Sequence, residues 1–171
     1  YFEVYDIDDD GEIARADFDR VIENARMIRG DSERSEAGRG LRDACLAFWE
    51  SLRTSADVDQ SGSVDLDEWL AYWQVTLEDD ERYEAEVEAI TNHLFSVFDT
   101  DEDEGIGSDE FCDFYGVFGL GANLARSIFV ELDANNDGRI SREELMEIGR
   151  QFYRSDDPGD VGNMLFGPFG M

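Results

Sequence analysis

Four twelve-residue segments of this chain share one pattern, and that pattern restricts the fold more than any other feature of the sequence. They begin at Asp6, Asp57, Asp99 and Asp133, and they read DIDDDGEIARAD, DVDQSGSVDLDE, DTDEDEGIGSDE and DANNDGRISREE. Each segment opens with Asp, places oxygen-bearing side chains at positions 1, 3 and 5, and ends on a carboxylate at position 12. A short, tightly turned segment with this spacing can surround a hard cation with about six to eight oxygen atoms.

The spacing is that of the EF-hand calcium loop, which lies between an entering and an exiting helix. One match could arise by chance, but four matches in 171 residues, each flanked by apolar residues at helical spacing, indicate calcium binding. Ahead of the second loop, for example, apolar residues recur at intervals of three and four: Leu41, Ala44, Cys45, Phe48, Trp49 and Leu52. We expect each exiting helix to begin immediately after position 12, with a core residue: Phe18, Trp69, Phe111 and Leu145.

A β-branched residue occupies position 8 of every loop, and this position joins the loops of paired EF hands through a short antiparallel bridge. We therefore expect Ile13 to face Val64, and Ile106 to face Ile140. The predicted fold class is all-α: a compact two-lobe EF-hand protein with four helix–loop–helix hands in two pairs and short β-bridges between paired loops.

The loop positions also predict the division of the chain. Residues 1–78 would form the N-terminal pair, residues 79–154 the C-terminal pair, and residues 155–171 a tail that folds back into the core. Tyr1 lies only five residues before the first loop, so the entering helix of the first hand is truncated and we expect the natural chain to continue upstream.

Two segments are predicted to be connectors. The stretch from Arg29 to Gly40 is polar and contains three glycines, so we interpret it as a connector within the first pair. Residues 77–86 join the two pairs and leave little room for a flexible tether. That short connection favours two lobes packed into one body.

The second and fourth loops match the calcium pattern most completely. The predicted ligands of the second loop are Asp57, Asp59, Ser61, Ser63, Asp65 and Glu68, and those of the fourth are Asp133, Asn135, Asp137, Arg139 and Glu144. Ser63 and Arg139 would each contribute a backbone carbonyl at position 7. The glutamate at position 12 can bind calcium with both of its oxygens.

The first loop differs from the others at its last position. Its predicted ligands are Asp6, Asp8, Asp10, Glu12 and Asp17, so position 12 is Asp instead of Glu. The Asp17 side chain is one methylene shorter, and a contact through one oxygen would lower the ligand count toward six, which suits magnesium. We therefore expect a mixed calcium and magnesium site in this loop.

The third loop differs from the others at its bend. Its predicted ligands are Asp99, Asp101, Asp103, Gly105 and Glu110, but Glu104 occupies position 6, where the backbone favours glycine. A side chain in a left-handed conformation costs about 1 kcal/mol or more. We expect binding to be weakest here, and three to four calcium ions in the whole protein.

The charge of the chain excludes several classes of function. The formal net charge is −29, and the four loops hold 22 of the 43 acidic residues. All 14 basic residues are arginine, without the clustering that nucleic-acid or anionic-membrane binding requires. Enzymes that depend on a lysine are excluded, no apolar run is long enough to insert into a membrane, and we expect no catalytic activity.

Three stretches carry a resemblance to a known family. The segment FEVYDIDDDGEIARADF resembles the first hand of invertebrate sarcoplasmic calcium-binding proteins, whose first loop also tends to end on Asp. The segment AFWESLRTSADVDQSGSVDLDEWLAYW is similar to the second hand of that family and of its relative calexcitin, and FYRSDDPGDVGNMLFGPF resembles their shared C-terminal segment. The family commonly carries one or two disabled hands, whereas all four loops keep their ligands here. The resemblance implies a monomeric, cytoplasmic calcium and magnesium buffer.

Two other functions stay open beside the buffer. A calcium sensor of the calexcitin type would expose apolar surface to a protein target, although the four methionines form no stripe of the kind that sensors use. A carrier of an apolar small ligand, similar to luciferin-binding proteins, is the other alternative. A photoprotein is disfavoured, because that family's cavity uses several histidines and this chain has one.

Overall fold

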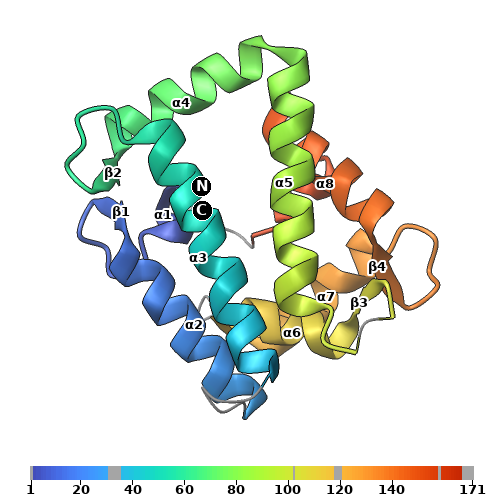
Figure 1. The fold of residues 1–171 in the computed structure, drawn as a ribbon. Helices are drawn as coiled ribbons and strands as arrows, with labels where there is room; N and C mark the ends of the chain where they lie inside the picture. Colours follow the sequence, from blue (N-terminus) through green and yellow to red (C-terminus); the bar gives the residue numbers. More distant parts are fainter. Residues whose placement is uncertain (1, 31–35, 102, 118–120, 158, 167–171) are drawn as a thin grey trace. The chain divides into compact units, whose positions relative to one another are not determined.

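The computed structural model shows an all-α protein with two short antiparallel strand pairs, which confirms the predicted fold class (Figure 1). It describes residues 2–30, 36–101, 103–117, 121–157 and 159–166. The N-terminal elements are α1 (Phe2–Tyr5), β1 (Glu12–Ala14), α2 (Arg15–Arg29), α3 (Glu36–Ala56), β2 (Ser63–Asp65) and α4 (Leu66–Glu78). They are followed by α5 (Asp80–Phe98), β3 (Gly105–Gly107), α6 (Ser108–Val117), α7 (Ala122–Leu132), β4 (Arg139–Ser141), α8 (Arg142–Arg154) and the 3-10 helix η1 (Val161–Met164).

The predicted start of the exiting helices is wrong by three residues. Helices α2, α4, α6 and α8 begin at position 10 of their loops, so position 12 lies at the third helical residue. The reason is a capping box: in α4 the Asp65 side chain accepts from the Glu68 backbone, and the Glu68 side chain accepts from the Asp65 backbone. Ser141 and Glu144 do the same at α8. The calcium-loop carboxylate thus also starts the helix.

The predicted connector between residues 29 and 40 is wrong in part. Helix α2 continues to Arg29 and ends on Gly30, whose left-handed φ of 70° lets its N–H reach the Arg26 carbonyl. Helix α3 already begins at Glu36, so residues 36–40 are helical, and residues 31–35 lie outside the described part of the chain. The two glycines after residue 36 cost about 1 kcal/mol each, which the packing of a 21-residue amphipathic helix offsets.

The chain divides into two compact units, Tyr1–Glu86 and Val87–Met171. The only residue outside a helix between α4 and α5 is Asp79, whose carboxylate accepts the Arg82 N–H at 3.0 Å and thereby caps α5. The division predicted from the sequence, between residues 78 and 79, falls beside this cap.

Aromatic side chains from all three long helices fill the core of the N-terminal unit. Phe18 packs against Trp49 with ring centroids 5.4 Å apart, and Tyr5 packs against Trp69 at 5.8 Å. The bridge residues Ile13 and Val64 are fully buried and face each other, as predicted. The two loops are therefore fixed to one core.

The C-terminal unit has an equivalent core, which the tail completes. Ile106 faces Ile140 as predicted, and Phe98 meets Phe114 with ring centroids 4.9 Å apart. The tail residues Leu165 and Phe166 are both 3% exposed. The Tyr115 hydroxyl donates to the Met164 carbonyl at 2.6 Å, which anchors η1, while Phe169 lies outside the described residues.

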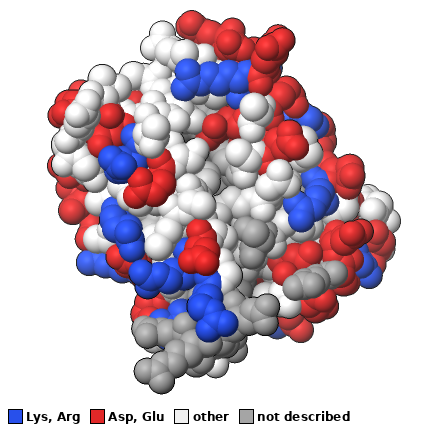
Figure 2. All heavy atoms as spheres, viewed as in Figure 1, with Lys and Arg blue, Asp and Glu red and all other residues white. Residues whose placement is uncertain are grey.

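The surface is strongly acidic, as the composition requires. Figure 2 shows many Asp and Glu side chains on the visible face, with arginines scattered among them. Several of the arginines form ion pairs on their own helix, such as Arg53 with Glu50 at 2.8 Å. Among the described residues, no helix combines the length and the apolar character needed to cross a membrane.

Candidate metal centres

The first residue of each loop organises the turn that follows it. Asp6 accepts the N–H groups of Asp10 and Gly11 at 3.1 and 2.9 Å. The second and fourth loops repeat this double contact at Asp57 and Asp133, and in the third loop Asp99 accepts from Asp103 at 3.1 Å. Because these contacts bend the chain around the carboxylate, its oxygens are directed to the inside of the loop.

Position 6 adopts the left-handed backbone conformation in all four loops. The glycines there have φ values of 89°, 94° and 92°, in the order Gly11, Gly62 and Gly138. In the third loop Glu104 has a φ of 67°. The sequence-based expectation of strain at Glu104 is therefore confirmed, because a residue with a Cβ adopts this conformation at a cost of about 1–2 kcal/mol.

Replacing Glu104 with glycine should tighten calcium binding at the third loop. The matched control is E104A, which loses the same carboxylate but keeps a Cβ and hence the strain. Since the loop can relax when no cation holds it, the strain counts against binding, and we expect E104G to bind about fivefold or more tightly than E104A. The measurement is a calcium titration followed through the Gly105 amide by NMR; equal affinities of the two variants would contradict the strain argument.

The carboxylate at position 12 closes each loop by accepting at least two backbone N–H groups. Glu68 accepts from Val58 at 2.8 Å and from Asp65 at 3.2 Å, with a different oxygen for each. Glu110 bonds in the same way to Thr100 and Gly107, and Glu144 to Asn135 and Ser141. The backbone thus holds both oxygens at position 12, where calcium requires a bidentate ligand.

Asp17 closes the first loop in the same manner despite its shorter side chain. It accepts from Ile7 at 3.0 Å and from Ala14 at 2.8 Å, and it is only 1% exposed. Burial raises the pKa of the Asp17 carboxyl, and the nearby Asp8 carboxylate raises it further. A carboxylate this deeply buried is costly without a compensating charge.

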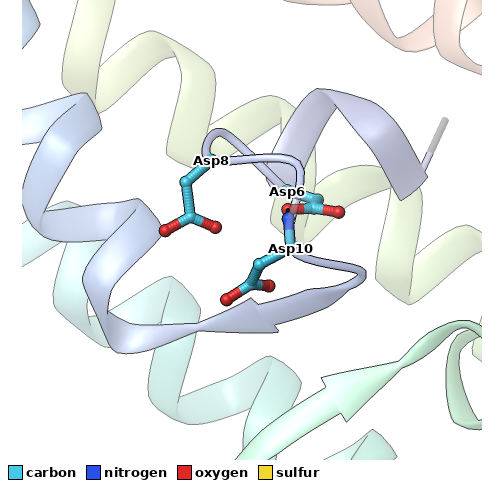
Figure 3. Close-up of side chains that lie close together, drawn as sticks. All are labelled: Asp6, Asp8 and Asp10. Atoms are coloured by element: carbon cyan, nitrogen blue, oxygen red, sulfur yellow. Dashed lines mark hydrogen bonds between the residues drawn. The ribbon is translucent and has the colours of Figure 1, made fainter.

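The first loop brings three predicted ligands together, and their arrangement fits a cation (Figure 3). Asp6, Asp8 and Asp10 come from the loop between α1 and β1, and each offers an oxygen within 4.8 Å of the others. Asp8 Oδ1 is buried and has no hydrogen-bond partner. A cation bound in the loop would satisfy this oxygen. Asp17 lies outside this group of three.

An arginine that sequence reasoning did not single out also contacts this site. Arg20 of α2 places Nη1 2.9 Å from Asp8 Oδ2. The guanidinium follows the loop by three residues and neutralises one of its carboxylates. The negative charge of Asp8, the predicted ligand at position 3, is therefore partly neutralised by Arg20.

The second and third loops each assemble two early carboxylates with the one at position 12. The groups are Asp57, Asp59 and Glu68 in one loop, and Asp99, Asp101 and Glu110 in the other, again with oxygens within 4.8 Å. Burial raises the pKa of Asp99, with the neighbouring Glu110 adding to it. Burial would also raise the pKa of Glu110, but hydrogen bonds from Thr100 and Gly107 outweigh it and lower that pKa. The Thr100 hydroxyl, 2.6 Å from Glu110, is a contact that the loop pattern does not predict.

The fourth loop is closed by the same hydrogen bonds as the others, but among the residues that the structure describes its carboxylates form no group of three like those of the first three loops. Asp133 is 6% exposed, and Glu144 accepts the Asn135 N–H across the loop. Asn135 and Asp137 occupy positions 3 and 5. The Asn135 side chain donates to Asp137 Oδ2 at 3.1 Å. One amide and three carboxylates still supply hard oxygen donors of the type that calcium requires.

The remaining predicted ligands are at positions 7 and 9. In the second loop the Ser63 carbonyl accepts from the Ser61 hydroxyl at 3.2 Å, and Asp65 is the exposed cap of α4. Glu12, Gly105 and Arg139 lie in the short strands, where their backbones take part in loop pairing. That these residues and the carboxylates bind the ion remains a prediction, which the loop geometry supports.

Comparisons with known proteins agree with this reading of the loops. The family model described as EF hand matches residues 55–71 and 125–148, which contain the second and fourth loops. A sarcoplasmic calcium-binding protein of Hediste diversicolor is 32% identical over 168 residues, covering 97% of this chain and 91% of the relative. Calexcitin-1 of Caenorhabditis elegans is 26% identical, covering 88% of this chain and 74% of the relative.

Solved structures show the same fold at lower sequence identity. A coelenterazine-binding protein from Renilla muelleri, in a calcium-loaded apo form, superposes with a TM-score of 0.80 at 22% identity. The match covers 97% of this chain and 90% of that one. This similarity concerns the arrangement of helices and loops, and it carries no statement about ligands.

Proposed function

This chain belongs to the family of sarcoplasmic calcium-binding proteins, and from that premise we propose that it is an intracellular buffer that binds three to four calcium ions. The observation that carries the proposal is the preformed closure of all four loops. In each, the position-12 carboxylate already accepts N–H groups from positions 2 or 3 and from position 9. Loops closed in this way direct several hard oxygen atoms to one point, as a calcium site requires.

The core of the C-terminal unit supports a buffer over a sensor. A sensor opens a hydrophobic groove on binding calcium, and its helices must separate from the residues that they cover. Here the tail packs into that region: Phe166 lies 5.3 Å from Phe152 and 6.0 Å from Phe114, measured between ring centroids. Opening of the helices would have to separate these rings and break the hydrogen bond of the Tyr115 hydroxyl.

A hydrophobic dye tests the buffer against the sensor. Adding calcium to protein already in millimolar magnesium should leave dye fluorescence almost unchanged, because the aromatic contacts of the tail persist. The variant Y115F serves as a sensitised control, since it removes the anchoring hydroxyl of the tail. A large calcium-dependent rise in dye fluorescence with the unmodified protein would favour the sensor.

A carrier of a small apolar ligand is less well supported. The cavity lined by Leu94, Phe98 and Leu165, among others, has a volume of about 10 Å³, enough for roughly one water molecule. Pockets for organic ligands commonly enclose about 300–1,000 Å³. The two pockets described in the core of the C-terminal unit are both far smaller than that.

We propose that magnesium competes with calcium at the first loop. The support is Asp17, which lies outside the group formed by Asp6, Asp8 and Asp10, whereas the glutamates of the second and third loops join theirs. Extending the side chain in D17E should therefore raise the calcium-over-magnesium preference of this site by roughly fivefold or more. The control is D19E, which adds the same methylene to an exposed residue of α2 that pairs with Arg15. Calcium titrations with and without millimolar magnesium make the comparison, and equal selectivity in both variants would exclude the role of Asp17.

The setting that we propose is the cytoplasm, with the protein acting as a monomer and without catalytic activity. The two cysteines, Cys45 and Cys112, form no disulfide, which suits a reducing compartment. A net charge of −29 opposes self-association before calcium is bound. Calcium ions are the proposed partner.

A further inference from the structure

We propose that Arg139, a residue of the fourth loop, sets the calcium affinity of the third loop by holding the Asp103 carboxylate in an ion pair that an entering cation must break. The inference rests on the proposed binding of calcium at both loops of the C-terminal unit. It assigns to the Arg139 side chain a role distinct from that of its backbone carbonyl, which is a predicted ligand of its own loop.

The contact joins the two loops directly. Arg139 Nη1 lies 2.9 Å from Asp103 Oδ2 and also donates to the Asp103 carbonyl at 3.2 Å. Pairing of β3 with β4 places Gly107 opposite Arg139 and Gly105 opposite Ser141. The Arg139 side chain therefore runs along the third loop and ends at its position 5.

Gly105 creates the space for this crossing. A Cβ added at Gly105 would lie 2.6 Å from Arg139 Cδ and 3.1 Å from its Cβ and Cγ. Gly105 is not among the residues with positive φ, so backbone conformation does not require glycine there. What requires it is the aliphatic stem of Arg139, and this close packing fixes the direction of the guanidinium.

The ion pair holds the Asp103 oxygen that has no backbone donor. Asp103 Oδ1 accepts the Gly105 N–H at 3.1 Å, while Oδ2 is held by the guanidinium, which must move before a metal can bind that oxygen. Asp103 lies outside the group formed by Asp99, Asp101 and Glu110. In the first loop the residue at the same position, Asp10, belongs to the group. The ion pair with Arg139 is thus found at the one predicted carboxylate ligand of the third loop that lies outside the group.

The expected effect is moderate because both partners are near half exposed. The side-chain exposures are 46% for Arg139 and 41% for Asp103, and ion pairs of this kind are screened by solvent. Removing the guanidinium should tighten calcium at the third loop about two- to fivefold. By linkage, calcium in the third loop and the arginine contact oppose each other to the same extent, so calcium binding should release the side chain.

The test compares R139M with a matched control, R142M. Both variants remove one positive charge from the fourth loop, but Arg142 is directed elsewhere: it donates to Asn92 at 2.7 Å and lies over the Phe95 ring at 4.3 Å. Calcium titrations followed by NMR should show tighter binding at Gly105 and Gly107 in R139M than in R142M, and R139Q should behave like R139M. Equal affinities in R139M and R142M would overturn the proposal.

A double-mutant cycle isolates the contact. In a D103N background, which removes the carboxylate charge, the excess effect of R139M should disappear. In chelator, without bound calcium, R139M should also shift the carboxyl ¹³C signal of Asp103 while R142M leaves it unchanged. An excess that persists in D103N, or an unchanged Asp103 signal, contradicts the inference. Absence of calcium binding at the second and fourth loops would instead refute the proposed function, so the two failures are distinguishable.

Discussion

Removing calcium with a chelator should strongly destabilise the protein and reduce its helix content. The loops concentrate 22 of the 43 acidic residues, and Asp6, Asp17 and Asp133 are each less than 10% exposed. Without a cation these carboxylates repel one another in a poorly solvated setting. Calcium at a hundred to a thousand times its Kd contributes roughly 3–4 kcal/mol at each site. With three sites filled, we expect the Tm to rise by about 20 °C or more.

Thermal unfolding followed by circular dichroism, in chelator and in millimolar calcium, measures this effect. The control is chelator with about 0.5 M potassium chloride, which screens surface repulsion without supplying a divalent ligand. We expect that salt to recover only a small part of the stability. Full recovery by potassium chloride would mean that general charge repulsion, and not occupied loops, accounts for the difference.

The variants E144Q and E68Q should each eliminate tight calcium binding at one loop. Glu144 joins Asn135 and Ser141 across the fourth loop, and an amide cannot accept both N–H groups while also offering two oxygens to calcium. We expect the affinity of the altered site to fall about 100-fold or more, since a charged, two-oxygen ligand is lost. Calcium titration with a competing chelator of known affinity measures the change.

Each of these variants has a neighbour that serves as its control. E143Q and D67N carry the same change of charge at position 11 of the same loops, on residues that are exposed. These control variants should lower calcium affinity only a few-fold, because each removes one negative charge from the loop without removing a ligand. If E144Q and E143Q bound calcium equally well, position 12 would not be the ligand that the geometry of the loop indicates.

The loops and their pairing could be predicted from the sequence because both follow from local spacing. The bridges of Ile13 with Val64 and of Ile106 with Ile140 are confirmed, as is burial of Phe18, Trp69, Phe111 and Leu145. The membership of the sarcoplasmic calcium-binding family is confirmed as well. In each case the signal lies in residues a fixed number of positions apart, so no tertiary information is needed.

The start of the exiting helices was misjudged although its signal is present in the sequence. Asp65 and Glu68 match the capping-box pattern, as do Ser141 and Glu144. In that pattern the helix begins at the residue directly after the first member of the pair. The last three positions of each loop are also the first three residues of the exiting helix. The early start of α3 at Glu36 is different, because glycine-rich sequence argues against a helix and only packing of its later turns reverses that preference.

The arginine contacts at the metal centres could not be derived from the sequence. Arg20 reaches Asp8 from the helix that follows the loop, and Arg139 reaches Asp103 from another loop, 36 residues away. Both depend on side-chain direction and on the space left by neighbours, such as Gly105. The carboxylates that the arginines contact, Asp8 and Asp103, belong to the first and third loops, whose sequences depart from the common pattern.

Isothermal titration of chelator-treated protein with calcium, with and without millimolar magnesium, counts the occupied loops and identifies the one at which magnesium competes. We expect three to four sites in the absence of magnesium, with tight binding at the second and fourth loops and magnesium competition at the first. One site or none, or heats that are unaffected by E68Q and E144Q, would contradict the proposal that these loops form a calcium buffer.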